Sequence, residues 1–174
     1  DQCGQCDDDD LNNCYDLEIP LHKGANLISF PALPDDNSLE SMMEPLAGNI
    51  SVVLSGGSVA QYLDNLGWIG TLTSIEQDAG YWVLAQQDTM LTVRDAVPVN
   101  YDEDGEVYYE LHAGNNLISY PFTTAISLEE GLGSAADSII AILGEGVSGM
   151  NIDGNFVGSL QAFEGGGGYW IIGT

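Results

Sequence analysis

Basic residues are almost absent from this chain. Lys23 and Arg94 stand against 27 Asp and Glu residues, which gives a formal net charge of −25 over 174 residues. Affinity for phosphate groups comes from Lys and Arg, so the composition argues against binding to nucleic acid or to anionic membranes. Self-repulsion on this scale destabilises a compact chain unless salt screens it or divalent cations bind. Such a protein suits seawater, brine or a calcium-containing fluid.

Long hydrophobic runs and catalytic motifs are lacking as well. No apolar run approaches the length of a membrane span. The two histidines, His22 and His112, occupy the same position in a repeat, which favours a structural hydrogen bond or simple exposure over catalysis or zinc binding. No Gly-x-Ser-x-Gly elbow occurs, and the glycines at 165–168 have no lysine or helix after them. They indicate a loop before a core strand, so we predict that the chain is not an enzyme.

Cysteine is confined to the segment 1–14, at Cys3, Cys6 and Cys14. Outside the cell, an odd number favours one local disulfide and one thiol that pairs with another chain. A reducing compartment would instead favour a metal-binding or redox Cys-x-x-Cys, but the βαβ context of such redox motifs is missing. A start at Asp1 without Met favours a chain cleaved from a precursor.

Two acidic clusters offer the oxygen ligands that Ca²⁺ takes in flexible loops. Asp7, Asp8, Asp9 and Asp10 form the first cluster, and Asp102 and Asp104 belong to the second. Bound Ca²⁺ is therefore the cofactor to consider. The alternative for the first cluster is a solvated acidic tail, and the second does not complete the EF-hand pattern.

The chain contains one long pattern twice. The run from Leu21 to Pro31 (LHKGANLISFP) returns from Leu111 to Pro121 (LHAGNNLISYP), and Gly80-Tyr81-Trp82 returns as Gly168-Tyr169-Trp170. The offset drifts only from 90 to 88 residues across the matched blocks, so we expect a duplicated domain with loop changes. The expected divisions are an N-terminal segment 1–14, a first domain 15–94, an acidic linker 95–105 and a second domain 106–174.

Each repeat has the local signals of a small β-domain. Alternating apolar residues at 17–21 and 107–111 predict a strand, which we expect to form a hairpin with the strand after the following glycine. Ser38 and Ser127 are expected to cap a short helix. The runs 50–54 and 139–143 predict buried central strands, and Asp153-Gly154 predicts a two-residue hairpin turn. The fold class is mainly β, a β-rich α+β chain of two tandem, homologous, β-sandwich-like domains with one short helix each.

Aromatic residues offer one further candidate site. Trp68, Trp82 and Trp170 would suit stacking on sugar rings if they were exposed together. Strand aromatics followed by Val or Ile are more often core residues.

The pattern Gly-x-Asn-Leu-Ile-Ser-(Phe/Tyr)-Pro…Gly-Tyr-Trp resembles a small β-domain that recurs in tandem in large secreted and surface-attached bacterial proteins and in marine viral structural proteins. Residues 1–14 are similar to the Asp-x-Cys-Gly-x-Cys units of secreted marine bacterial proteins, although Asp7 replaces the usual glycine. The resemblance implies an extracellular module for structure or attachment, a virion appendage included, with no catalytic residues.

We therefore expect an extracellular structural subunit that assembles with copies of itself into a filament or surface layer through its N-terminal Cys/Asp segment. The alternative is a carbohydrate-binding or adhesion module of a larger secreted protein, with cell-surface glycans as partners.

Overall fold

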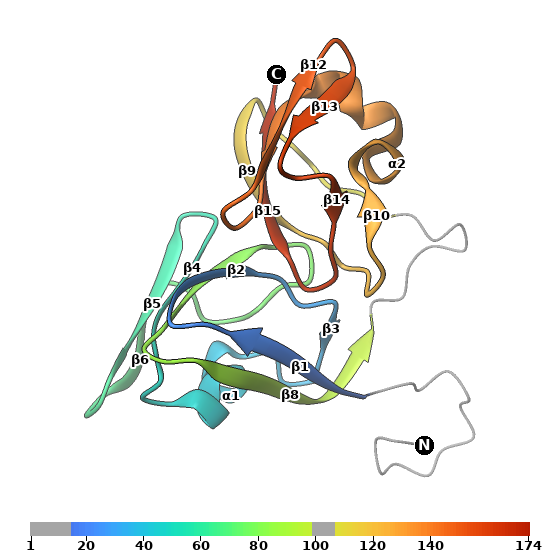
Figure 1. The fold of residues 1–174 in the computed structure, drawn as a ribbon. Helices are drawn as coiled ribbons and strands as arrows, with labels where there is room; N and C mark the ends of the chain where they lie inside the picture. The colour runs from blue at the N-terminus through green and yellow to red at the C-terminus, as the bar shows by residue number, and fades with distance from the viewer. Residues whose placement is uncertain (1–14, 99–106) are drawn as a thin grey trace.

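The structure, a computed structural model, describes residues 15–98 and 107–174. Residues 15–98 form unit 1 and residues 107–174 form unit 2, the lower and upper halves of Figure 1. The mainly β class is confirmed, because antiparallel sheets build both units and only short helical segments accompany them. The expected sites at Cys3, Cys6, Cys14, Asp7, Asp8, Asp9, Asp10, Asp102 and Asp104 lie outside the described residues.

Unit 1 packs a five-stranded sheet against a three-stranded sheet. The strand order is β2-β7-β4-β5-β6 in the larger sheet and β1-β8-β3 in the smaller one. Alternate residues of β7 are buried, so Tyr81 and Val83 enter the core between the sheets while Trp82 faces the other way. The elements are β1 (Tyr15–Leu21), β2 (Gly24–Ile28), β3 (Ala32–Leu33), α1 (Leu39–Met43), a 3₁₀ turn (Glu44–Leu46), β4 (Ile50–Ser55), β5 (Ser58–Leu63), β6 (Gly67–Gly70), β7 (Tyr81–Ala85) and β8 (Thr89–Pro98).

Unit 2 repeats the larger sheet with the order β13-β12-β11-β15-β9. Its second sheet is a single pair, β10 with β14. The core lies between them and includes Tyr120, Phe163 and Ile171. The elements are β9 (Gly114–Ser119), β10 (Ile126–Ser127), α2 (Leu128–Leu132), a 3₁₀ segment (Gly133–Ser138), β11 (Ile139–Leu143), β12 (Ser148–Ile152), β13 (Asn155–Gly158), β14 (Ala162–Phe163) and β15 (Gly168–Gly173).

The local signals in the sequence form the expected elements. Ser38 accepts a hydrogen bond from the Ser41 N–H (3.3 Å), and Ser127 accepts one from the Glu130 N–H (3.2 Å), so each serine caps its helix. Asp153 and Gly154 have φ angles of 52° and 88° and turn β12 into β13. The strands β4 and β11 are central, but each exposes part of one face to solvent.

The expected first hairpin is wrong. β1 pairs with β8, whereas β2 pairs with β7, so the two strands enter different sheets. In unit 2, residues 107–111 form no strand. The strand β8 also continues to Pro98, so residues 95–98 of the expected linker belong to unit 1.

Candidate functional site

The repeated asparagine organises the turn that starts each unit's edge strand. Asn26 accepts a hydrogen bond from the His22 N–H (2.9 Å) and donates through Nδ2 to the carbonyls of His22 (2.9 Å) and Gly24 (3.2 Å). Asn116 makes the same contacts with His112 (2.9 and 2.8 Å) and Gly114 (3.1 Å). The repeated motif therefore positions two equivalent edge strands, β2 and β9, with two equivalent histidines.

The tyrosine of each Gly-Tyr-Trp motif ties down the loop before its strand. The Tyr81 hydroxyl accepts from the Glu76 N–H (2.6 Å), and the Tyr169 hydroxyl accepts from the Glu164 N–H (2.7 Å). Burial raises the pKa of Tyr81 to about 12 and also raises the pKa of Tyr169. Both hydroxyls thus stay neutral at ordinary pH.

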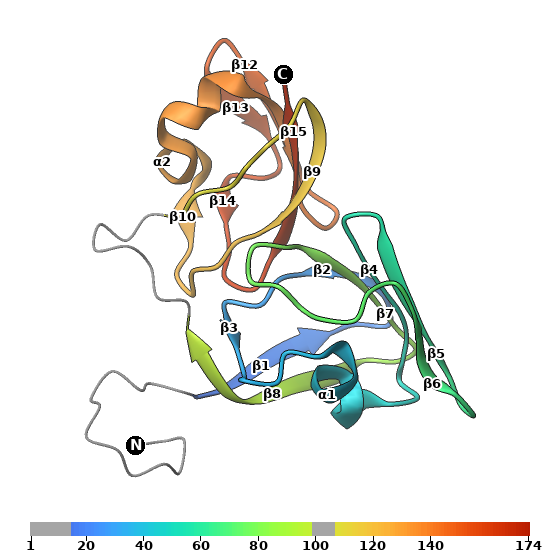
Figure 2. The ribbon, with the colours of Figure 1, turned by 180° about the vertical axis from the view of Figure 1, so that it is seen from behind.

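The two units meet where these edge strands and loops cross (Figure 2). The Ser29 N–H donates to the Gly166 carbonyl (2.7 Å), and the Ser119 N–H donates to the Asp78 carbonyl (3.1 Å). Two isolated β-bridges join the same segments of the two units, Ile28 with Gly167 and Ala79 with Ile118. Each of these backbone contacts has a counterpart at the equivalent repeat position, so the backbone of the interface has the self-complementary form of a two-fold dimer within one chain.

Glycine is required at the start of each Gly-Tyr-Trp motif because the other unit's backbone passes there. A Cβ on Gly80 would lie 2.6 Å from the Ile118 carbonyl oxygen, and one on Gly168 would lie 2.7 Å from the Ile28 carbonyl oxygen. Close chain approach thus explains the last glycine of the run 165–168.

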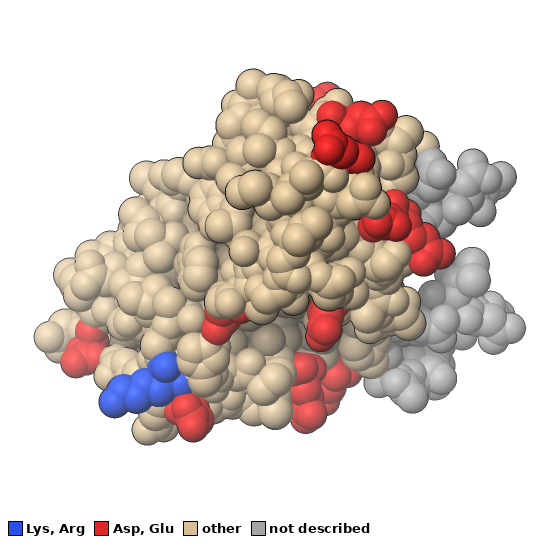
Figure 3. All heavy atoms as spheres, turned by 45° about the horizontal axis from the view of Figure 1, so that its top comes forward, with Lys and Arg blue, Asp and Glu red and all other residues tan. Residues whose placement is uncertain are grey.

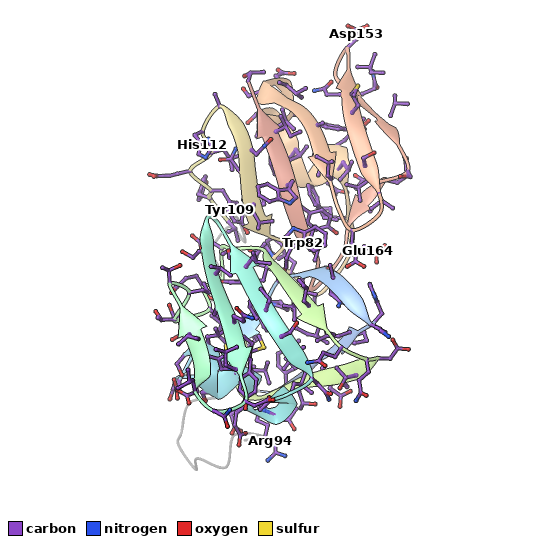
Figure 4. All side chains as sticks on the ribbon, turned by 90° about the vertical axis from the view of Figure 1, so that its left-hand side faces the viewer. Trp82, Arg94, Tyr109, His112, Asp153 and Glu164 are labelled. Carbon is purple, nitrogen blue, oxygen red and sulfur yellow. The ribbon has the colours of Figure 1, made fainter. Side chains whose placement is uncertain are left out.

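The two junctions differ in their side-chain contacts. Ser29 Oγ donates across the interface to the Gly167 carbonyl (2.7 Å), whereas the equivalent Ser119 Oγ contacts the Tyr109 hydroxyl (2.9 Å) within unit 2. At the first junction Glu145 of the β11–β12 turn accepts from the Leu27 N–H through Oε2 (2.7 Å) and contacts the His22 ring through Oε1. At the second junction Gly56 occupies the position of Glu145. An open cavity of about 620 Å³ lies there, and Gly56, His112 and Leu117 are part of its lining. Figure 4 shows Tyr109, another lining residue, at the tip of the β4–β5 hairpin.

The contact with Glu145 raises the pKa of His22, and a hydrogen bond to the Lys23 carbonyl adds to the effect. A carbonyl oxygen only accepts, so His22 Nδ1 carries a proton (Nδ1 to O, 2.9 Å). Nε2 meets a carboxylate and needs a second proton to donate to it. The contact therefore favours the protonated form of His22.

The outer faces of the two five-stranded sheets are apolar. None of their ten strands contains Asp, Glu, Lys or Arg, although the chain has a net charge of −25. Figure 4 looks onto both sheets, one above the other, and a broad upper-left area of Figure 3 shows no charged side chain. The exposed apolar side chains on these strands are Leu54, Val59, Ile69, Ile140, Leu143, Met150, Ile152 and Val157.

The three tryptophans do not form one platform. Trp68 packs against the core of unit 1 and makes an edge contact with Tyr62 (5.5 Å between ring centroids). Trp82 and Trp170 are half-buried at equivalent places on the two outer faces. Trp170 also lines the cavity beside His112.

Sequence reasoning missed the contact between the units and the role of Glu145. The signal available was the change from Gly56 to Glu145 at matched positions. The consequence of this change can be recognised only from the structure, in which β2 passes the β11–β12 turn.

Within residues 15–98 and 107–174, no group of three or more His, Cys, Asp and Glu side chains is placed to hold a metal ion. No helix in this part of the chain has the length and apolar character to cross a membrane. Comparison with models of known families, with curated proteins and with solved structures finds no match.

Proposed function

We propose that this chain is an extracellular, non-enzymatic structural subunit that associates with copies of itself through the outer faces of its two five-stranded sheets. The observation that carries the proposal is the absence of charge from all ten strands in so acidic a chain. Large exposed apolar patches rimmed by polar groups mark interaction sites.

The exposure of individual side chains supports this role. Met150 and Val157 are paired across β12 and β13, and each is 56% exposed. Ile152, two residues further along β12, is 51% exposed. A solvated outer face normally carries polar residues at such positions, so these side chains gain most when another surface covers them.

Charge indicates that the partner is a second copy. Two chains of net charge −25 repel one another wherever their carboxylates approach. Contact between the uncharged faces keeps the carboxylates at the rim, where salt screens them over about 8 Å at physiological ionic strength. Self-association through this face is therefore expected to strengthen with salt.

Sedimentation at several protein and salt concentrations tests the proposal. Met150→Asp and Val157→Asp are expected to shift the assembly to monomer. Met90→Asp is the matched control, because Met90 is 45% exposed but lies on β8, outside the two larger sheets. A wild-type chain that stays monomeric at all concentrations and at high salt would refute self-association through this face.

The N-terminal segment enters the proposal as a covalent link between copies. Cys3, Cys6 or Cys14 would join neighbouring subunits by a disulfide in an oxidising environment, and Ca²⁺ would bind the neighbouring aspartates. A non-reducing gel and calcium titration of the full chain test these two points separately from the sheet contact.

A carbohydrate-binding role is the second candidate. Trp82 and Trp170 lie on the outer faces rather than in the cores, where a sugar ring can stack on them. Quenching of tryptophan fluorescence by glycans, lost in Trp82→Ala and Trp170→Ala, would favour this function.

A further inference from the structure

The two halves of the chain present the same pair of hydrogen-bonding groups to different surroundings. His22 and His112 have matching ring positions, because each Nδ1 lies 2.9 Å from the carbonyl of the next residue. Each histidine is also held by the asparagine four residues later, Asn26 or Asn116, through equivalent contacts. The edge strand that follows supplies a backbone N–H, from Leu27 in unit 1 and Leu117 in unit 2.

In unit 1 this pair binds a carboxylate. Glu145 bridges the Leu27 N–H and His22 Nε2, one carboxylate oxygen to each. Both contacts are charge-assisted, which makes them stronger than neutral hydrogen bonds. The first junction therefore shows what chemistry the pair accepts.

In unit 2 the same pair faces an open cavity. The N–H groups of Leu117 and Ser119 point to the same side of β9, since residues two apart in a strand share a direction. Ser119 donates across the unit interface, so the Leu117 N–H also points away from β15. No described residue accepts from it, and Gly56 has no side chain to fill the place that Glu145 occupies in the other junction.

We propose that this cavity binds an acidic sugar whose carboxylate bridges the Leu117 N–H and the His112 ring, as Glu145 does in the other junction. A cavity of about 620 Å³ holds far more than one carboxylate. Trp170 lines it and offers an aromatic face to a sugar ring. A uronic acid combines the two required features, a carboxylate and a ring.

Charges at the rim shape the binding. Asp78 and Glu110 also line the cavity, and both are exposed. They repel an anionic ligand, whereas the Leu117 N–H and the His112 ring offer it hydrogen bonds. Salt screens exposed charges, so we expect uronate to bind more tightly at 0.5 M than at about 0.05 M salt, the opposite of ordinary anion binding.

Nuclear magnetic resonance titration of the full chain with glucuronate, acetate and glucose tests the proposal. Glucuronate is expected to shift the Leu117 amide and the His112 ring signals, and to bind at least about tenfold more tightly than acetate. Glucose should leave these signals unchanged. Equal affinities for acetate and glucuronate, or no shift at Leu117, would overturn the assignment to an acidic sugar.

Two pairs of variants check the geometry. His112→Ala is expected to weaken glucuronate binding at least about tenfold, whereas His22→Ala, at the junction that Glu145 already fills, should leave it unchanged. Gly56→Glu supplies the missing carboxylate and should block the cavity. Gly56→Gln is its control, since both variants strain the same left-handed turn position (φ 51°). Similar binding by Gly56→Glu and wild type, with a folded variant, would overturn the proposal.

A change of protein concentration distinguishes an acidic sugar in the cavity from a carboxylate of a neighbouring copy. If the Leu117 amide shifts on raising protein concentration and acetate reverses the shift, a carboxylate of a second copy fills the cavity, and the acidic sugar is refuted. Met150→Asp separates this outcome from association through the outer faces, because Met150 does not line the cavity.

Discussion

Unit 1 closes its core and unit 2 leaves one side open. In unit 1 the sheet β1-β8-β3 covers the core, with Leu17, Ile19 and Leu91 buried beneath it. The described part of unit 2 contains no counterpart of the β1–β8 pair, and a cavity of about 510 Å³ opens onto its core beside Tyr120 and Phe163. The same motif thus builds two different packing environments.

The difference shows that a strand needs a partner as well as a pattern. Residues 107–111 alternate as residues 17–21 do, but only the latter pair with β8. Leu21 is 3% exposed, whereas the equivalent Leu111 is 39% exposed. Residues 107–111 belong to none of the sheets in the described part of the chain, and the exposed Leu111 gains little apolar burial to stabilise a strand there.

Truncation of these two leucines is the largest expected contrast. Leu21→Ala should lower the free energy of unfolding by about 3 kcal/mol, because it leaves a cavity in a closed core. Leu111→Ala should lower it by less than about 1 kcal/mol. Urea unfolding measures both, and equal losses would contradict the open side of unit 2.

Substitution of the two interface glycines tests whether the two units make equivalent contacts. Gly80→Ala and Gly168→Ala should each destabilise the contact between units by about 1–3 kcal/mol, since the added methyl group meets a carbonyl oxygen. Ala79→Gly serves as a control that adds no atoms at the same loop. Hydrogen exchange at Ser29 and Ser119 reports the loss. A large effect from only one glycine would refute the two-fold relation.

The buried tyrosines give a smaller effect with a pH signature. Tyr81→Phe leaves the Glu76 N–H without its acceptor and should cost about 1 kcal/mol. The phenol ionises near pH 10 when unfolded and at about 12 in the fold. Stability linked to Tyr81 is therefore present below pH 10 and lost as the pH rises toward 12. Spectrophotometric titration of wild type and Tyr81→Phe measures this, and an ordinary phenol pKa would contradict the burial.

Local features of the fold could be predicted from the sequence because their causes are local. The Ser38 and Ser127 caps and the Asp153-Gly154 turn depend on neighbouring residues only. The pairing of β1 with β8 could not, because it joins residues about 70 positions apart and competes with the nearer β2. The Gly80 and Gly168 contacts depend on a second unit's backbone, which no pattern within one repeat encodes.

The smallest expected effect concerns the contact between His22 and Glu145. His22 lies at the surface, so Glu145→Gln should change stability little, but it should lower the His22 pKa toward its usual 6.5. The raised pKa means that the contact stabilises the fold fully below about pH 6.5 and is lost as the pH rises through the raised value. A nuclear magnetic resonance titration of the ring measures the pKa, with Glu164→Gln as a control at another surface loop. An unchanged His22 pKa in Glu145→Gln would show that Glu145 does not bind the ring. The comparison on which the carboxylate site at His112 and Leu117 is based would then fail.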